Sequence, residues 1–337
     1  MTTIKDVAQE AGVSVATVSR LLNDTGVVHP ETAARVTAAI QKLSYEPNLL
    51  ARNFRRSESR VILILSPNIT NPYYAHILAG IGDVFSNLGY SAVIFNTSDA
   101  PEREREALEM LKRHRADGVI LMANTLSSQE FKEYADQFPL VQCSEYDPNL
   151  QLARVSIDNY LATQEAIDYL VGLGHRRIAT ISSENNYIST QLRMRAYQDT
   201  LQRYNISLSD EYIKHASYDY SFKSGKAKAK ELLTTDPMPT AIFCISDTLA
   251  LGAVIAAQEL GYCVPEDVTV IGFDDVEHTT MFHPYITTVA QPCYELGRHS
   301  AELLFAQITH ASDYTREVVL PHQLIIRESS APPLILD

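Results

Sequence analysis

Residues 3–56 constrain this chain most, because their first part encodes three short helices with recognisable ends. Thr3 can cap the first helix, and Asp6 stands three residues later, as in a capping box. Gly12, which tolerates a positive φ, ends that helix. The apolar residues between these ends recur at helical spacing and predict the buried face: Ile4, Val7, Ala8 and Ala11.

Two more helices follow with signals of the same kind. Ser14 can cap a second helix, and Pro30 can begin a third, where its missing N–H costs little. The predicted apolar faces are Val18, Leu21 and Leu22 in the second helix and Ala33, Val36, Ile40 and Leu43 in the third. Helix, short turn and helix is the helix-turn-helix arrangement, whose second helix lies in the major groove of DNA.

The strings IKDVAxxAGVSxxTVSRxLN, YxPN and AR occur in that order within residues 4–52. In these strings the chain resembles the lactose-repressor (LacI/GalR) family of bacterial regulators, and the resemblance covers practically the whole chain. The alternative, a generic small helical domain, does not explain why caps, spacing and the following basic segment all agree. The resemblance implies a DNA-binding head at 1–46, a hinge at 47–60 and an effector-binding and dimerisation domain at 61–330.

The second helix of the head supplies the predicted base-reading residues, Val15, Ala16 and Arg20. Arg20 can donate bidentately to a guanine edge, whereas Val15 and Ala16 offer only apolar contact, for instance with a thymine methyl. Val15 has an alternative interpretation as a core residue, because Val18 lies three positions on. The side chains expected to hold phosphates are Thr3, Ser14, Thr17, Asn23 and His29.

The hinge could form one short helix between Asn48 and Phe54, which would be marginal alone in water. The resemblance implies that it folds on DNA and inserts an apolar tip into the minor groove. Phe54 stands where relatives usually carry Leu, and Leu50 is the second candidate; alternatively, Phe54 packs under the sensor. The predicted hinge contacts are Asn48, Leu50, Ala51, Arg52 and Phe54, and the basic residues Arg52, Arg55, Arg56 and Arg60 contact phosphates or form a solvated linker.

From residue 61 onward, short apolar strands alternate with helices in two successive copies. Such alternation predicts an α/β fold with doubly wound parallel sheets, in two similar lobes. The resemblance implies a periplasmic-binding-protein-like sensor behind the all-α helix-turn-helix head. Its lobes would be about 61–158 plus 292–319 and 162–288 plus 322–330, with the chain crossing between them near 158–162, 289–293 and 319–322.

Charge is unevenly spread over these parts. The net charge of the chain is −13, yet residues 1–60 hold eight Lys/Arg against six Asp/Glu. A mildly basic head on an acidic body favours DNA contact by the head alone. The opening residues show no signal peptide, no run of about 18 apolar residues occurs, and the four cysteines form no C-x-x-C pair. We therefore expect a cytoplasmic protein with reduced thiols and no membrane partner.

Open α/β sheets bind ligands beyond the carboxyl ends of their strands. Applied to the predicted strands, and joined with the resemblance, this rule gives the expected effector-binding residues: Tyr73, Tyr74, Asn124, Ser144, Ser189, Arg193, Tyr220, Ser246 and Asp274. Arg193 and the opposing Asp274 could grip a polyol or a heterocycle bidentately. One of Tyr73 and Tyr74 could instead be core and the other exposed. Asp247 is expected to cap the helix at 248–260, and Asp158 to be structural at a crossover.

Enzymatic and metal-binding interpretations find little support. Phosphate-loop, dinucleotide and nucleophile-elbow motifs are missing from the sequence. No group of His, Cys and Asp residues has the spacing of metal ligands. Together with the missing motifs, this leads us to expect neither a cofactor nor a catalytic residue.

We therefore predict a homodimeric, ligand-responsive repressor that binds a near-palindromic DNA operator. The strings ARNFRRSESRVIL, SEY, AQPCYELGR and QLIIRES are similar to the nucleoside-responsive subgroup of the family, which favours a nucleoside effector. A sugar, a sugar phosphate or another small polar molecule remains open. So do two other classes: a catabolite-control regulator that docks a phosphorylated carrier protein near Tyr294 and Glu295, and a solute-binding protein without a DNA role.

Overall fold

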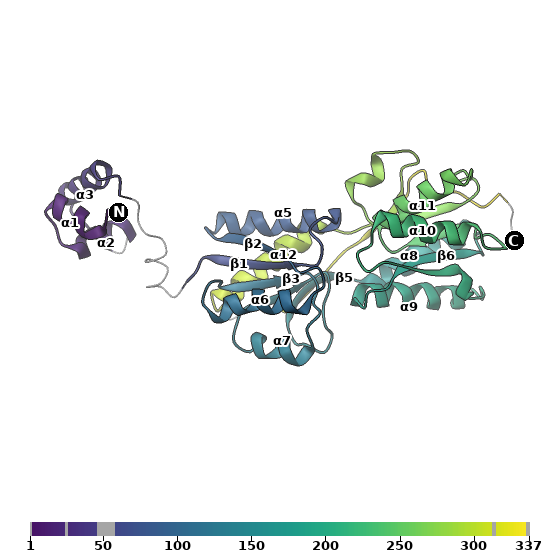
Figure 1. Cartoon of the computed structure of the whole chain (residues 1–337), viewed down its shortest axis with the longest axis horizontal. Coiled ribbons are helices and arrows are strands. Elements are labelled where there is room, and N and C mark those ends of the chain that lie inside the picture. The colour runs from purple at the N-terminus through teal and green to yellow at the C-terminus, as the bar shows by residue number, and fades with distance from the viewer. Residues whose placement is uncertain (1, 24–25, 46–57, 312–314, 335–337) are drawn as a thin grey trace. The chain divides into compact units, whose positions relative to one another are not determined.

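The computed structural model describes residues 2–23, 26–45, 58–311 and 315–334, and the chain divides into two compact units, Met1–Ser59 and Arg60–Asp337. The first unit, here called the head, is helical. The second, the sensor, contains two sheets with helices packed against them (Figure 1).

The head consists of α1 (Ile4–Ala11), α2 (Val15–Asn23) and α3 (Pro30–Lys42). Thr3 and Asp6 form the predicted capping box, and Gly12 ends α1 with a φ of 63°. The buried core is Val7, Ala8, Ala11, Val18, Val36 and Ala39, with Ile40 and Leu43 packed at its edge. The predicted face of α3 was therefore slightly misplaced, because Ala39 is buried while Ala33 is only half-buried.

Arg35 of α3 ties the end of α1 into this core. Its Nε donates to the carbonyl oxygen of Ala11 at 3.1 Å, and its Nη2 donates to that of Gly12 at 3.0 Å. Carbonyls at a helix C-terminus lack partners within the helix and carry partial negative charge, so a guanidinium suits them. The turn before α2 is thereby held at a fixed angle.

Lobe 1 of the sensor is built on a six-stranded sheet in the order β11-β5-β4-β3-β1-β2. Its strands are β1 (Val61–Ser66), β2 (Ser91–Asn96), β3 (Gly118–Leu121), β4 (Leu140–Cys143), β5 (Ala153–Ile157) and β11 (Glu317–Leu320). Its helices are α5 (Pro72–Asn87), α6 (Pro101–Lys112), α7 (Ser128–Ala135) and α12 (Cys293–Ile308). The helix α7 was not anticipated from the sequence, although Ser127 and Glu130 form a capping box at its start.

Lobe 2 is built on a second six-stranded sheet, in the order β12-β10-β9-β8-β6-β7. Its strands are β6 (Ile178–Ser183), β7 (Ile213–Ala216), β8 (Ala241–Cys244), β9 (Thr269–Asp274), β10 (Thr287–Ala290) and β12 (Gln323–Ile325). Its helices are α8 (Asn159–Gly172), α9 (Ile188–Arg203), α10 (Phe222–Leu233) and α11 (Asp247–Glu259), with 3-10 turns η1 (Asp210–Tyr212) and η2 (Glu277–Thr280). Among the described strands, β12 is antiparallel to its neighbour β10 and the other pairings are parallel.

The chain passes between the lobes three times: at Asp158 between β5 and α8, at 291–292 between β10 and α12, and at 321–322 between β11 and β12. Asp158 is structural, because its carboxylate accepts from the N–H of Leu161 and caps α8. Each central strand is buried on both faces, as expected for a parallel sheet with helices on either side. In β1, Ile62 and Ile64 join one hydrophobic cluster while Leu63 and Leu65 join another.

Helices α5 and α12 pack unusually closely across lobe 1. A Cβ added at Gly80 would lie 2.1 Å from the carbonyl oxygen of Tyr294, and one added at Gly297 would lie 2.0 Å from that of Ile77. Only glycine permits backbones to approach this closely. This contact fixes α5, whose first turn carries the tyrosines of the site described next.

Candidate functional site

The head presents the predicted base-reading residues on the surface of α2. Ala16 and Arg20 are exposed, and Val15 is 39% exposed, whereas Val18 is fully buried. The alternative that Val15 belongs to the core is therefore wrong. One helix face thus offers a guanidinium beside two small apolar side chains, which is the set the sequence suggested for a major-groove surface.

Two of the predicted phosphate-holding residues of the head, Thr3 and Ser14, also cap helices. The Thr3 hydroxyl donates to Asp6 Oδ2 at 2.8 Å, and Ser14 Oγ lies 2.9 Å from Thr17 Oγ1 while accepting from the N–H of Thr17. His29 is exposed at the start of α3, and Asn23 is the last residue of α2. These positions lie at the starts of α1, α2 and α3 and at the end of α2, and backbone N–H groups at helix starts can also meet phosphates.

The predicted hinge residues Asn48, Leu50, Ala51, Arg52 and Phe54 lie outside the described residues. Arg60, by contrast, is described and belongs to lobe 1. Its Nη1 donates to the carbonyl oxygen of Leu88 at 3.3 Å, its guanidinium carbon lies 4.9 Å from the ring centroid of Tyr90, and its backbone N–H donates to Asp117. The alternative that Arg60 is a solvated linker residue is therefore wrong.

In the sensor, residues after the strand ends of both lobes meet in a cleft between them. Its inner part has a volume of about 20 Å³, room for roughly one water molecule. It is lined by Asn71, Tyr73, Tyr74, Ser144, Glu145, Ser189, Arg193, Tyr220, Ser246 and Asp274. Every predicted effector-binding residue lines this inner part except Asn124, which follows β3 and lines neither part of the cleft.

Arg193 and Asp274 lie at the floor of the inner part and are already bonded to protein groups. Arg193 Nε donates to Asn159 Oδ1 at 3.0 Å, its Nη1 donates to the carbonyl oxygen of Ile245, and its guanidinium carbon lies 3.6 Å from the centroid of the Phe273 ring. Asp274 accepts from Gln291 Nε2 at 2.8 Å. Burial raises the pKa of Asp274 to about 7, and the nearby Arg193 opposes that rise.

Both tyrosines of α5 are buried, so the alternative of one core and one exposed ring is wrong. The Tyr73 hydroxyl lies 2.7 Å from Ser144 Oγ and donates to Gln291 Oε1 at 3.3 Å. Tyr74 packs edge-on against Tyr73, with 5.2 Å between ring centroids, and lines both parts of the cleft. Tyr73 of α5 thus connects to the segments that follow β4 and β10, while the ring of Tyr74 forms a wall of the cleft.

The expected role of Asp247 was wrong. Ser246 caps α11, accepting from the N–H of Leu249, and Asp247 is the first residue of the helix. The Asp247 carboxylate is buried, where it accepts from Thr288 Oγ1 at 2.6 Å and from the N–H of Val276 at 2.9 Å. Ser and Asp are equally good caps, so their order alone could not settle which one performs that role.

Two carboxylates of lobe 1 bind groups of lobe 2 across the cleft. Glu145 accepts from the backbone N–H of Ser189 at 3.1 Å and from its hydroxyl, and Asp99 accepts from the Tyr187 hydroxyl. Burial raises the pKa of both carboxyls. Neither acid was among the predicted effector residues, although Glu145 directly follows the predicted Ser144 at the end of β4.

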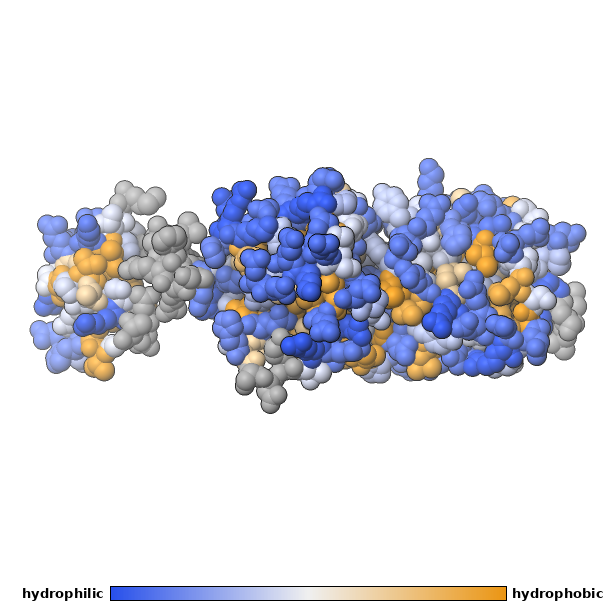
Figure 2. All heavy atoms as spheres, turned by 90° about the horizontal axis from the view of Figure 1, so that it is seen from below, coloured by the Kyte–Doolittle hydropathy of each residue, from blue (hydrophilic) through white to orange (hydrophobic). Residues whose placement is uncertain are grey.

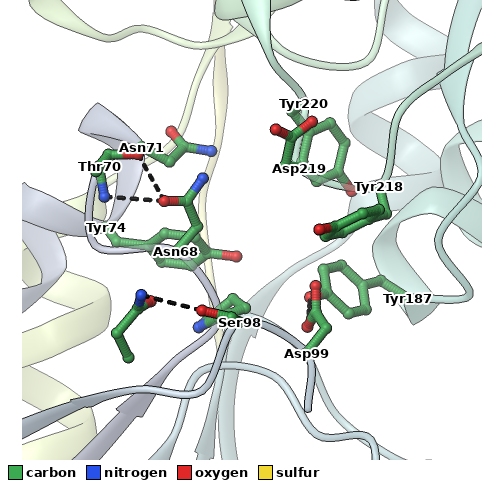
Figure 3. A pocket seen from close by; sticks show the side chains of 12 residues that line it. Asn68, Thr70, Asn71, Tyr74, Ser98, Asp99, Tyr187, Tyr218, Asp219 and Tyr220 are labelled. Carbon is green, nitrogen blue, oxygen red and sulfur yellow. Dashed lines mark hydrogen bonds between the residues drawn. The ribbon is translucent and has the colours of Figure 1, made fainter.

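The outer part of the cleft is larger, about 230 Å³, and is rich in tyrosine. Figure 3 shows Tyr74 on the lobe 1 side and Tyr187, Tyr218 and Tyr220 opposite it on lobe 2. The remaining lining residues are Pro67, Asn68, Thr70, Asn71, Asn96, Ser98, Asp99 and Asp219. Tyrosine rings can stack on a flat ligand while amides and hydroxyls bond to its edge.

Comparison with known proteins agrees with this geometry. Residues 3–48 match the model described as bacterial regulatory proteins, lacI family, and residues 167–330 match the periplasmic binding protein-like domain. The HTH-type transcriptional repressor CytR of Escherichia coli (strain K12) is 36% identical over 329 residues, covering 97% of this chain and 96% of CytR. This chain belongs to the lacI family of bacterial regulatory proteins.

Other lacI-family proteins match over equal lengths. Catabolite control protein A of Priestia megaterium is 32% identical over 330 residues, covering 97% of this chain and 99% of that protein. The lac repressor dimer bound to operator and the anti-inducer ONPF has a TM-score of 0.87 at 27% identity, covering 98% of this chain and 99% of that one. The family and the fold class predicted from the sequence are confirmed.

The described residues of this lacI-family chain offer neither a membrane-spanning helix nor a metal-binding cluster. None of their helices combines the length and the apolar character needed to cross a membrane. Within the same residues, no three His, Cys, Asp or Glu side chains converge in a way that could hold a metal ion.

Proposed function

We propose that this lacI-family protein is a homodimeric repressor whose binding to a near-palindromic operator is controlled by a nucleoside, or a polar molecule of similar size, in the interlobe cleft. The observation that carries the proposal is that Arg193 and Asp274 line the inner cleft together with the rings of Tyr74 and Tyr220. A guanidinium and a carboxyl group can bind hydroxyls or ring edges bidentately, and the tyrosine rings can cover a flat face.

The volume of the cleft indicates how such a ligand would act. Small-molecule sites usually enclose ~300–1,000 Å³, whereas the inner part here measures about 20 Å³. A ligand that reaches Arg193 must therefore separate the lobes. Arg193 can then donate to it through N–H groups other than those that bind Asn159 and Ile245. It can shift the protein between two lobe arrangements only through different affinities for them.

The catabolite-control alternative requires a surface for a phosphorylated carrier protein near Tyr294. The charges there do not favour it, because Arg298 already pairs with Glu295 at 2.6 Å and with Glu302 at 2.5 Å. The Tyr294 hydroxyl donates to Asp83. A phosphoryl group would approach a region dominated by carboxylates.

Two other classes fit the site less well. A solute-binding protein without a DNA role does not account for the exposed Val15, Ala16 and Arg20 on α2. An enzyme would need reacting groups that face one another, and the adjacent Asp274 and Asp275 diverge, because Asp275 pairs with Arg327 at 2.6 Å while Asp274 faces the cleft. We therefore propose a regulator without catalytic activity.

Footprinting tests this proposal with the full-length protein on its own promoter region. We expect protection of a near-palindrome with two half-sites, and a dimer mass in solution by light scattering. Isothermal titration with ribonucleosides should then show binding in the cleft. Failure to protect any palindrome in that region would contradict the repressor assignment.

A further inference from the structure

Acidic side chains stand on both walls of the outer cleft. Asp99 belongs to lobe 1 and Asp219 to lobe 2, and Figure 3 shows both among tyrosines, amides and hydroxyls. Asp99 accepts from the Tyr187 hydroxyl, and Asp219 accepts from Ser217 Oγ and from the N–H of Ser221 at 3.2 Å. These bonds hold both carboxylates in place, so neither side chain can turn away without losing partners.

The inner part adds two more acids. Glu145 and Asp274 line it together with Arg193, which is the one cationic side chain among the described residues that line either part. Arg193 therefore faces carboxylates within a buried space. The complete cleft sets four carboxyl groups against a single guanidinium.

The acids of this cleft already resist further negative charge. Burial raises the pKa of Asp99, of Glu145 and of Asp274, because negative charge is poorly solvated at these positions. A phosphomonoester adds a charge of about −1.5 to −2 near neutral pH. A phosphate group beside these carboxylates would bring like charges close together, which is unfavourable.

One further cation lies near the outer wall. Arg103 Nη1 donates to the carbonyl oxygen of Asn96 at 3.3 Å and to Ser98 Oγ at 3.1 Å. The side chain is thus bonded to the loop that follows β2. It is the residue on which a phosphate would have to rely if the outer cleft admitted one.

We propose that the cleft selects unphosphorylated ligands, and that Asp99 and Asp219 are the residues that reject the phosphorylated forms of the same molecules. This inference rests on the proposed function, since it concerns the same cleft. Ionised carboxylates only accept hydrogen bonds, so the favoured ligand is a neutral or cationic molecule rich in hydroxyl or amino donors. Sugar phosphates and nucleotides are thereby excluded as effectors.

Isothermal titration of the full chain with matched pairs tests the inference. The pairs are the four ribonucleosides with their 5′-monophosphates, and glucose with glucose 6-phosphate. For any pair that binds, we expect the phosphorylated member to bind about 100-fold more weakly or worse. In the double variant Asp99→Asn with Asp219→Asn, that ratio should fall by about tenfold or more, because the shape is kept and the charge is removed.

Two control variants separate charge from other effects. Tyr187→Phe removes the hydrogen bond to Asp99 but keeps the carboxyl group, and should change the ratio less than the Asn variants do. Glu184→Gln removes an exposed acid that follows β6 and does not line the cleft, and should leave the ratio unchanged.

The alternative outcomes are distinct. Equal affinity within a pair would overturn the inference and leave the proposed ligand site standing, and sensitivity of that binding to Arg103→Gln would identify the phosphate contact. A ratio that Tyr187→Phe changes as much as the Asn variants would also overturn it. If no member of any pair bound, both the inference and the ligand site would be refuted.

Discussion

The carboxylate of Glu145 in lobe 1 accepts two hydrogen bonds from Ser189 in lobe 2, one from its N–H at 3.1 Å and one from its hydroxyl. Ser189 lies in the first turn of α9, so the acid also faces the positive end of that helix. With the bond from Tyr187 to Asp99, this pair holds the lobes together over a nearly filled inner cleft. The lobe arrangement therefore depends on a few polar contacts that a ligand can replace.

Replacing Glu145 by Gln should loosen the closed arrangement. A hydrogen bond to a charged group contributes ~1.5–3 kcal/mol, so backbone hydrogen exchange around residues 187–190 should become about tenfold faster or more. Glu184→Gln is the control, because Glu184 is exposed and lies close in sequence to the probed residues 187–190. Unchanged exchange in Glu145→Gln would show that other contacts hold the lobes.

The pH dependence of stability should be traceable to Asp274. Its pKa is raised to about 7 by burial from an ordinary value of 3.8, so the folded protein favours the protonated form. The stability that protonated Asp274 contributes is fully present below the ordinary pKa of 3.8. It is lost as the pH rises through the pKa of Asp274 in the folded protein. Between pH 5.5 and pH 8 the wild-type Tm should therefore fall more than that of Asp274→Asn, which cannot titrate there. Parallel Tm curves for the two proteins would contradict this assignment.

Gly80 and Gly82 lie on the same helix and should respond oppositely to alanine. A Cβ at Gly80 would lie 2.1 Å from a backbone oxygen of α12, whereas nothing lies within 4 Å of one at Gly82. Gly80→Ala should therefore destabilise the sensor by about 1–3 kcal/mol, and Gly82→Ala should stabilise it by about 0.5–1 kcal/mol. Denaturant unfolding measures both. Similar effects at the two positions would show that the helices can move apart at little cost.

Arg20→Ala should weaken specific DNA binding by about 1–3 kcal/mol and relax the preference at one base pair. The physical reason is the loss of a bidentate donor to a base edge from an exposed position on α2. Competition between operator and random DNA at fixed salt measures the effect. Equal losses on both kinds of DNA would indicate a phosphate contact instead.

Much of this architecture could be predicted, because the helix-capping residues and the apolar patterns in the sequence agree with the packing of the folded chain. Thr3, Asp6 and Gly12 mark the ends of one helix, and the apolar strands of both lobes are continuous enough to be recognised. The rule that ligands bind beyond strand ends then places Arg193 and Asp274 in one cleft before any packing is known.

The outer cleft could not be predicted in the same way. Tyr218 and Asp219 follow β7, a four-residue strand that is half-exposed and lacks an apolar run, so the sequence does not mark it as a strand. The importance of Asp99 and Tyr187 becomes clear only from the hydrogen bond between them, which joins the two lobes. The surface drawn in Figure 2 is largely hydrophilic with scattered apolar patches, and such a surface does not point to a partner by itself.

The central claim is that the cleft around Arg193 controls DNA binding, and one titration tests it most directly. Fluorescence anisotropy follows a labelled operator fragment while ligand is added to wild type, to Arg193→Gln, and to Arg195→Gln, an exposed arginine on the same helix. We predict that the ligand changes the operator affinity of wild type and Arg195→Gln by roughly 5–150-fold, while Arg193→Gln binds the operator normally and does not respond. A full response in Arg193→Gln would contradict the claim.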